Sequence, residues 1–394
     1  VLNPGWLLNP NPSRPFTVLE RLMTESRALF LYVEILFVPI MGSLALYYDD
    51  FAISRGLFDP PTTAVAIAAV VIGLIMAVVM RRRLPWFAFG TLWFIAAHLI
   101  ESTVVMLELV HLHRNYVAYI GPILAAVILI WRGLAIEGGR LRLPLALGVT
   151  LVLASVTVQR ASQWSHPLEQ ATFEVHHRPD SPRANYELGR LLYIAAKNQR
   201  DETLRQEARR YFERATKLDP VSVNAPIALL IVDGAAHLPE SRPAKLALMT
   251  RLSTRPLAAT EVHFLRSLVD CQRYPECRRP PQDIIDVFGS ALSQPLLRKP
   301  VKADLLVILG MYYATYLNDL PACIRTMEAA VELVPNDSNH RLNLAHALIA
   351  ARRLDDAEMM VARAEADDKL GVYASRIKEY RKDLAEFRQG HKDV

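Results

Sequence analysis

The strongest constraint on this chain is a change in composition near residue 160. Before that point lie five apolar runs with almost no charge inside them, and after it small and aromatic residues recur at regular spacing. An α-helix needs about 17–25 mainly apolar residues to cross a bilayer. The sequence therefore predicts an all-α protein with a polytopic transmembrane domain of about five spans, followed by a repeat domain. The expected spans are residues 28–48, 62–80, 84–100, 116–131 and 143–158.

Composition agrees with this division. Apolar residues make up 52% of the 394 residues, a high fraction for one soluble domain. The net charge of +5 is modest, and arginines beside the apolar runs account for much of it. We therefore expect a lipid bilayer as a partner and no nucleic acid. The chain begins with Val1, and residues 1–17 contain no secretory signal, so we expect a piece of a longer protein or a non-standard start codon.

Basic residues predict an orientation for the spans. Loops rich in Lys and Arg stay in the cytoplasm, whereas the loops at 49–61 and 101–115 contain few basic residues. Five crossings then place residues 1–27 in the cytoplasm. They place everything after the fifth span in the periplasm, with the protein in a bacterial inner membrane. The arginines that set this orientation are Arg21, Arg27, Arg81, Arg82, Arg83, Arg132, Arg140 and Arg142.

Ionisable residues near the expected outer face are the candidates for function. His98 and Glu101 are three positions apart at the end of the third run, which puts them on one helical face. Such groups at membrane depth are costly, so they either have a function or are paired with other polar groups. Asp49 and Asp50 form an acidic pair in the loop after the first run, where a solvated loop is the alternative explanation.

Part of the membrane half resembles a known family. The likeness covers roughly residues 14–125 and lies in three stretches: RPFTVLERLMTESRALFLYVEILFVPI, YYDDFAISRGLFDPPTT and RRRLPWFAFGTLWFIAAHLIESTVVMLELVHLHRNYVAYIGP. They resemble the polytopic glycosyltransferases of the GT-C type, in the branch with tetratricopeptide repeats after the membrane domain. The positions that match are Trp93, Phe94, Glu101, Ser102, Glu108, Arg114, Tyr116 and Gly121.

The resemblance implies transfer of a sugar from a polyprenyl-phosphate donor to a protein acceptor. A carboxylate can take the proton of an acceptor hydroxyl, and a cation can hold the departing phosphate. No cofactor other than this lipid-linked sugar donor is implied. GT-C enzymes keep their catalytic acid in an outer loop far upstream, so we expect this chain to be catalytically incomplete alone. The implied catalytic residues are Asp49, Asp50 and Glu101, and the implied substrate-binding residues are Arg114, Tyr116, Glu108 and His98.

The second half carries the spacing of tetratricopeptide repeats. In these repeats, small residues lie where two antiparallel helices touch and larger ones fill the gap. Cys323 and Ala357 occupy equivalent positions 34 residues apart, as do two further pairs. In an earlier candidate at Leu188, seven extra residues are expected to lengthen the turn between its helices. The expected domains are an N-terminal segment (1–27), a transmembrane domain (28–159), a linker (160–181), a TPR-like α-solenoid (182–370) and a capping helix with tail (371–394).

The cysteines are few. Cys271 and Cys277 enclose five residues, and an oxidising periplasm favours a disulfide between them over two free thiols. Cys323 occupies a small-residue position of its repeat and is expected to be buried. No further Cys and His spacing would supply four zinc ligands, so no metal is expected.

These observations leave three classes of function open. The preferred hypothesis is the C-terminal part, or a shortened relative, of a GT-C glycosyltransferase whose repeat groove holds a protein or peptide acceptor. The alternative is a non-enzymatic membrane-anchored scaffold that organises proteins of the cell envelope. A transporter is the third class, but the five runs show no internal repeat.

Overall fold

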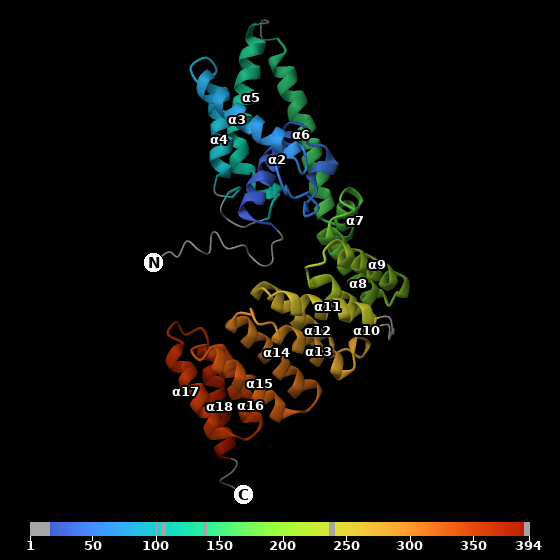
Figure 1. Cartoon of the computed structure of the whole chain (residues 1–394), viewed down its shortest axis with the longest axis vertical. Coiled ribbons are helices and arrows are strands. Elements are labelled where there is room, and N and C mark those ends of the chain that lie inside the picture. Colours follow the sequence, from blue (N-terminus) through green and yellow to red (C-terminus); the bar gives the residue numbers. More distant parts are fainter. Residues whose placement is uncertain (1–15, 100, 104–107, 137–139, 236–240, 390–394) are drawn as a thin grey trace. The chain divides into compact units, whose positions relative to one another are not determined.

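The computed structural model describes residues 16–99, 101–103, 108–136, 140–235 and 241–389. These residues form 17 α-helices and no strand, joined by short 3₁₀-helices and loops (Figure 1). The chain divides into two compact units, Val1–Asp219 and Pro220–Val394. The all-α prediction is confirmed for the residues that the structure describes.

Three helices of the first unit are long and apolar enough to cross a membrane. They are α3 (Thr62–Met80), α5 (Tyr116–Ile136) and α6 (Arg142–Trp164). The 19 residues of α3 rise about 28 Å, which matches the thickness of a bilayer core. None of the residues of α6 is buried, which suits a helix surrounded by lipid.

The run at 84–100 forms a shorter helix, α4 (Pro85–His98), of 14 residues. Small residues let it lie close to α5. A Cβ atom added at Gly90 would come within 2.7 Å of the Ala125 Cβ, and one at Gly121 within 2.7 Å of the Trp93 Cβ. Close approach through small residues is typical of helix pairs in membranes. Ile100, the expected end of this run, lies outside the described residues.

The run at 28–48 differs most from its prediction as a membrane span. The structure has α2 (Val18–Phe37) instead, followed by the 3₁₀-helix η1 (Met41–Leu44). Thr17 and Glu20 form a capping box that fixes the start of α2. Val38 precedes Pro39, which disfavours the helical conformation, and the helix ends there. Five spanning helices are therefore not seen among the described residues.

α2 lies across one end of α3, α4 and α5. Near its start, Arg21 Nη2 donates to the carbonyl oxygen of Glu101 at 2.5 Å, just after α4. In the second half of α2, the carbonyl oxygen of Tyr32 accepts a hydrogen bond at 2.9 Å from the hydroxyl of Tyr119, which lies at the start of α5. The predicted orientation put Arg21 in the cytoplasm and Glu101 on the outer side. Their hydrogen bond is incompatible with that placement, because both residues must lie on one side.

The segment at 160–181, expected to be a solvated linker, is helical and packed. α6 ends at Trp164, and α7 (Pro167–His177) begins after two residues. Arg160 forms an ion pair with Glu174 at 2.9 Å, and Glu174 also accepts a hydrogen bond from the backbone N–H of Leu46 at 2.7 Å. Glu174 is only 1% exposed. These contacts therefore hold α7 firmly against the end of α6 and against the loop at Leu46.

The first hairpin consists of α8 (Pro182–Gln199) and α9 (Glu202–Leu218), and it belongs to the first unit. Its turn is only Arg200, in the left-handed conformation with φ 55°, and Asp201, which caps α9. The extra residues therefore lengthen the two helices and not the turn. The unit boundary after Asp219 also differs from the domain boundary predicted at residue 182.

In the second unit each helix packs against helices one or two places away in the chain, such as α10 against α11 and α12, and α14 against α15 (Figure 1). Residues of the 34-residue spacing are buried where α14, α15, α16 and α17 touch; Cys323, Ala330, Ala357 and Ala364 are at most 1% exposed. These pairs are TPR-like helical hairpins, as the spacing predicts. The helices of this unit are α10 (Asn224–Ala235), α11 (Ser241–Thr254), α12 (Val262–Cys271), α13 (Pro281–Leu292), α14 (Lys299–Tyr316), α15 (Leu320–Leu333), α16 (Ser338–Ala350), α17 (Leu354–Asp367) and α18 (Ala374–Gln389).

Two glycines of this unit give opposite predictions for substitution by alanine. A Cβ at Gly310 would lie 2.7 Å from Thr326 Oγ1 and 3.3 Å from the Cys323 carbonyl oxygen. Thr326 is stiff at χ1, so overpacking should outweigh the helix propensity of alanine, and Gly310→Ala should destabilise the protein by about 1 kcal/mol or more. At Gly289 nothing lies within 4 Å, and Gly289→Ala should stabilise it by up to about 1 kcal/mol. Urea unfolding of both variants measures the signs, and equal signs would contradict the packing.

Candidate functional site

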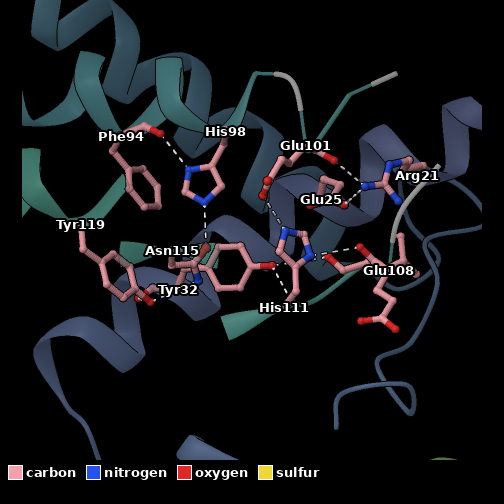
Figure 2. Close-up of polar contacts among 11 residues, drawn as sticks. Arg21, Glu25, Tyr32, Phe94, His98, Glu101, Glu108, His111, Asn115 and Tyr119 are labelled. Carbon is pink, nitrogen blue, oxygen red and sulfur yellow. Dashed lines mark hydrogen bonds and ion pairs between the residues drawn. The ribbon is translucent and has the colours of Figure 1, made fainter. Parts of the chain in front are cut away.

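The candidate site lies where α2 meets the loop between α4 and α5 (Figure 2). His98, the last residue of α4, is 4% exposed. Its Nδ1 donates to the carbonyl oxygen of Phe94 at 2.8 Å, and its Nε2 lies 3.2 Å from Asn115 Oδ1. Its ring stacks on Tyr32, with centroids 5.4 Å apart. The structure therefore places His98 inside the core, where it holds helices together.

Tyr32 connects α2 to the loop. Its hydroxyl accepts a hydrogen bond from the backbone N–H of His111 at 3.0 Å and donates to the carbonyl oxygen of Leu109 at 3.5 Å. Its side chain is fully buried. A buried hydroxyl with both a donor and an acceptor partner stabilises one arrangement of the loop. The position of His111 therefore depends on Tyr32.

Glu101 and His111 form a carboxylate–imidazole pair in the site. Glu101 Oε2 lies 3.0 Å from His111 Nε2, and His111 Nδ1 lies 3.2 Å from the carbonyl oxygen of Glu108. The Glu101 side chain is 35% exposed, whereas the His111 side chain is fully buried. Both ring nitrogens face oxygen acceptors, so both contacts are hydrogen bonds only if His111 is cationic or Glu101 carries the proton. One carboxylate thus faces solvent with an imidazole behind it.

The environment of His111 favours its neutral form. Burial lowers the pKa of His111, the hydrogen bond with Glu101 opposes this, and the charge of Arg114 lowers the pKa further. The member of the pair that a ligand can reach is the Glu101 carboxylate, since the His111 side chain is fully buried. Such a pair can accept a proton from a hydroxyl that binds next to Glu101.

A second charged pair lies next to Glu101. Arg21 and Glu25, one helical turn apart on α2, form an ion pair at 2.8 Å and are almost completely buried. Burial raises the pKa of Glu25 from 4.5 to about 7, although the charge of Arg21 lowers it. The Arg21 side chain also bonds the Glu101 carbonyl, so this pair fixes the backbone beside the carboxylate.

Asp49 lies at a different place, against the first hairpin. Its Oδ2 accepts a hydrogen bond from the backbone N–H of Arg183 at 2.9 Å, and its Oδ1 accepts one from the Ser181 hydroxyl. These groups form the N-terminus of α8, where free N–H groups and the helix dipole favour a carboxylate. Burial raises the pKa of Asp49, and its hydrogen bonds oppose that shift. The structure therefore uses Asp49 to dock the hairpin.

Asp50 and Glu108 also contact this region. Asp50 lies 3.5 Å from Arg178, whose guanidinium is 3.6 Å from the centroid of the Tyr48 ring. Glu108 forms an ion pair with Arg183. The loops at 49–61 and 101–115 are thus tied to the same end of the hairpin.

The remaining predicted residues of this region are more accessible. Arg114 ends the 3₁₀-helix η2 (Leu112–Arg114) and is half-buried. Within the described parts of the chain, its guanidinium has no hydrogen-bond or ion-pair partner. Tyr116, the first residue of α5, is 74% exposed. The structure brings Arg114 close to His111 and leaves Tyr116 at the surface.

The cysteines belong to the second unit. Cys271 and Cys277 form a disulfide, and Cys323 is a free, buried cysteine. Burial raises the pKa of Cys323 to about 11, so its thiol stays protonated. In the described residues, no group of three or more His, Cys, Asp or Glu side chains is arranged to hold a metal ion.

Several residues of the site were not predicted. His111 is the most important, because it completes the pair with Glu101. Its signal was present in the run HLHRN, a polar aromatic cluster between two apolar runs. Arg21 and Glu25 also carried a signal, since their spacing of four places them on one helical face. Nothing in the sequence pointed to Tyr32, because it is one of many aromatic residues within the apolar runs.

Comparisons with known proteins add little. No family model matches this chain, and no curated protein matches it. Among solved structures, the chain is similar to one from Pseudomonas aeruginosa described as "Functional Characterization of Pseudomonas Aeruginosa pilF". The two share 17% identity over 54% of this chain and 90% of that chain, with a TM-score of 0.30. A likeness this weak carries no argument, and no family match supports a GT-C glycosyltransferase.

Glu25 makes the stability of the protein depend on pH. Its folded-state pKa of about 7 lies above the ordinary value of 4.5. The group therefore stabilises the folded protein below its ordinary pKa, and this contribution, up to about 3 kcal/mol, is lost as the pH rises through 7. Glu25→Gln should remove this loss.

Unfolding of the detergent-solubilised protein at about pH 5 and about pH 8 measures the effect. The lowered pKa of His111 has the opposite effect on stability as the pH rises. The change in stability between the two pH values is therefore compared between the wild type and Glu25→Gln. Glu169→Gln is the matched control, because its side chain is 72% exposed. A wild-type difference that persists in Glu25→Gln would contradict the assignment.

Proposed function

We propose that this protein is a membrane-anchored helical-repeat protein whose hairpins bind a protein or peptide on the outer face of a bacterial inner membrane. One observation carries the proposal. The apolar helix α6, with none of its residues buried, leads through α7 directly into the hairpin of α8 and α9 within one compact unit. Stacked helical hairpins form extended surfaces suited to binding other proteins.

The ends of the membrane helices support a revised topology. α3 begins, α4 ends and α5 begins at the end of the bundle that α2 covers. The arginines at 81–83 and at 140–142 lie in the connections at the opposite ends of these helices. The positive-inside rule favours a cytoplasmic location for those connections. In this topology α3, α5 and α6 cross the bilayer and the shorter α4 returns the chain to the outer side, which puts α2, the candidate site and the hairpins outside the cytoplasm.

Reporter fusions test this topology. A reporter that is active only in the cytoplasm should stay silent after Val394, and one that is active only outside it should give a signal there. Fusions in the connection between α3 and α4, after Arg82, should give the reverse pattern. A strong cytoplasmic signal from the fusion after Val394 would overturn the proposal.

A glycosyltransferase remains the second candidate, favoured by the Glu101 and His111 pair beside Arg114. In this hypothesis, Glu101 takes the proton of an acceptor hydroxyl, and Arg114 holds the phosphate that leaves with the polyprenyl chain. Asp49 is the weaker choice as the base, because both its oxygens accept hydrogen bonds from the hairpin. The activity would belong to the whole protein, of which this sequence can be one part.

Substitutions in the whole protein test the second candidate. Arg114→Ala and Glu101→Gln should each lower glycosylation of the acceptor by about a hundredfold or more, since each removes a group that acts on the reacting atoms. Arg210→Ala, an exposed arginine of α9, should leave it unchanged. Mass spectrometry of envelope proteins from cells that carry each variant measures the loss. Glycosylation that persists unchanged in Arg114→Ala and Glu101→Gln would remove this candidate.

A further inference from the structure

The polarity of α2 is the inverse of that of a helix on the surface of a soluble protein. Its charged residues Arg21 and Glu25 are buried, at 0% and 2% exposed. Its apolar residues Leu19 and Phe37, by contrast, are 65% and 54% exposed. In water, an amphipathic helix turns its apolar face to the core and its charges to solvent. α2 is therefore built for an apolar surrounding on its outer face.

The exposed apolar residues of α2 lie along one side of the helix. We name Leu19, Leu22, Phe30 and Phe37 the apolar stripe; each is at least 41% exposed. A residue advances about 100° along an α-helix, so these positions fall within one narrow sector. Most of the buried residues of α2, with Arg21, Glu25 and Tyr32 among them, lie on the opposite side, whereas Met23 and Ser26 are buried on the side of these four residues. Beyond the helix, the apolar residues Val38 and Ile40 are also exposed, at 56% and 61%.

We propose that α2 lies flat in the outer leaflet of the membrane, with lipid acyl chains covering the apolar stripe. The proposal rests on the proposed membrane insertion of α3 to α6. α2 packs against α3, a helix proposed to cross the membrane, and the first turn of α3 also exposes an apolar residue, Val65, at 70%. A helix with one apolar side and one polar side at this level suits the boundary between headgroups and acyl chains.

The charges of α2 fit the same placement. No charged residue belongs to the apolar stripe, and the Arg21 and Glu25 pair is turned toward the loop after α4. Glu34 lies beside the apolar stripe and is exposed, within reach of headgroups and water, whereas Arg27 donates to the carbonyl oxygen of Ala52. Because both halves of α2 contact loops at one end of the bundle, the helix lies across that end and does not cross the membrane.

This placement has a consequence for the candidate site. Glu101 accepts the Arg21 hydrogen bond through its backbone, so its position is fixed by a helix that itself lies in the leaflet. A carboxylate held there is at the level of lipid headgroups. The site therefore suits a ligand with a polar group joined to a membrane-embedded chain.

Nitroxide labels placed on the full chain in lipid vesicles test the proposal. Single cysteines replace Leu22, Phe30 and Phe37, and collision with oxygen and with a water-soluble nickel complex reports their depth. Ile75 of α3, 57% exposed, is the membrane control, and Glu358 of α17, with a side chain that is 57% exposed, is the water control. The native cysteines are a disulfide pair and a buried thiol, so the wild-type chain gives the labelling background.

Labels at the stripe positions should collide with oxygen far more often than with the nickel complex. Their depth should be about 5–10 Å below the phosphates, which is shallower than the label at Ile75. Frequent nickel collisions would place them in water and overturn the proposal. Low collision with both reagents would mean that a protein segment or a second copy covers them, which also overturns it. Nickel access at Ile75 would instead defeat the proposed membrane insertion.

A second measurement avoids substitutions. Lipids with a photoactivatable group near the middle of the acyl chain are mixed with the unaltered protein and irradiated. Cross-linked lipid on α2 peptides that contain the apolar stripe is the expected result. Cross-links on α3 peptides without any on α2 would contradict the proposal and leave the membrane insertion standing.

Discussion

The contact of α2 with the loop between α4 and α5 holds the first unit together. Tyr32 supplies its hydroxyl to the loop, its ring to His98 and its carbonyl oxygen to Tyr119, so one residue of α2 holds the end of α4, the loop and the start of α5, all far from it in the sequence. Arg21 adds a fourth connection at the Glu101 carbonyl. Each of these polar groups is buried, and leaving one without its partner would cost about 1–3 kcal/mol. The geometry of the candidate site is set by these bonds.

Much of the fold could be predicted because its signals are local. The apolar run at 62–80 is α3 to the residue, since an uninterrupted apolar stretch forms a helix whatever surrounds it. The 34-residue spacing identified Cys323 and Ala357 as contact positions, because only small residues fit where helices touch. The run at 28–48 was misread for the opposite reason. Its hydrophobicity is that of a span, but Pro39 ends the helix, and the charges that precede the run belong to the same helix.

The candidate site could be predicted only in part. The sequence drew attention to Glu101 and Arg114, and the structure shows that both act on His111. Glu101 forms a hydrogen bond with His111, and the charge of Arg114 lowers the pKa of His111. The sequence could not show that the Asp49 carboxylate accepts hydrogen bonds from the first hairpin. A contact between positions 49 and 183 leaves no trace in local composition. The prediction of a solvated linker failed for the same reason. Glu174 looks like an ordinary surface carboxylate until Arg160 and the backbone of Leu46 are seen beside it.

The docking of α8 by Asp49 also helps to position the first hairpin. Asp49 caps α8, Glu108 pairs with Arg183, and Arg160 ties α6 to α7 through Glu174. Two of these attachments, from Asp49 and Glu108, are made to the start of α8, and the third holds α7, the helix that precedes it. The loop that carries Glu101 and His111 thus also positions the start of the first hairpin, through the ion pair of Glu108 with Arg183.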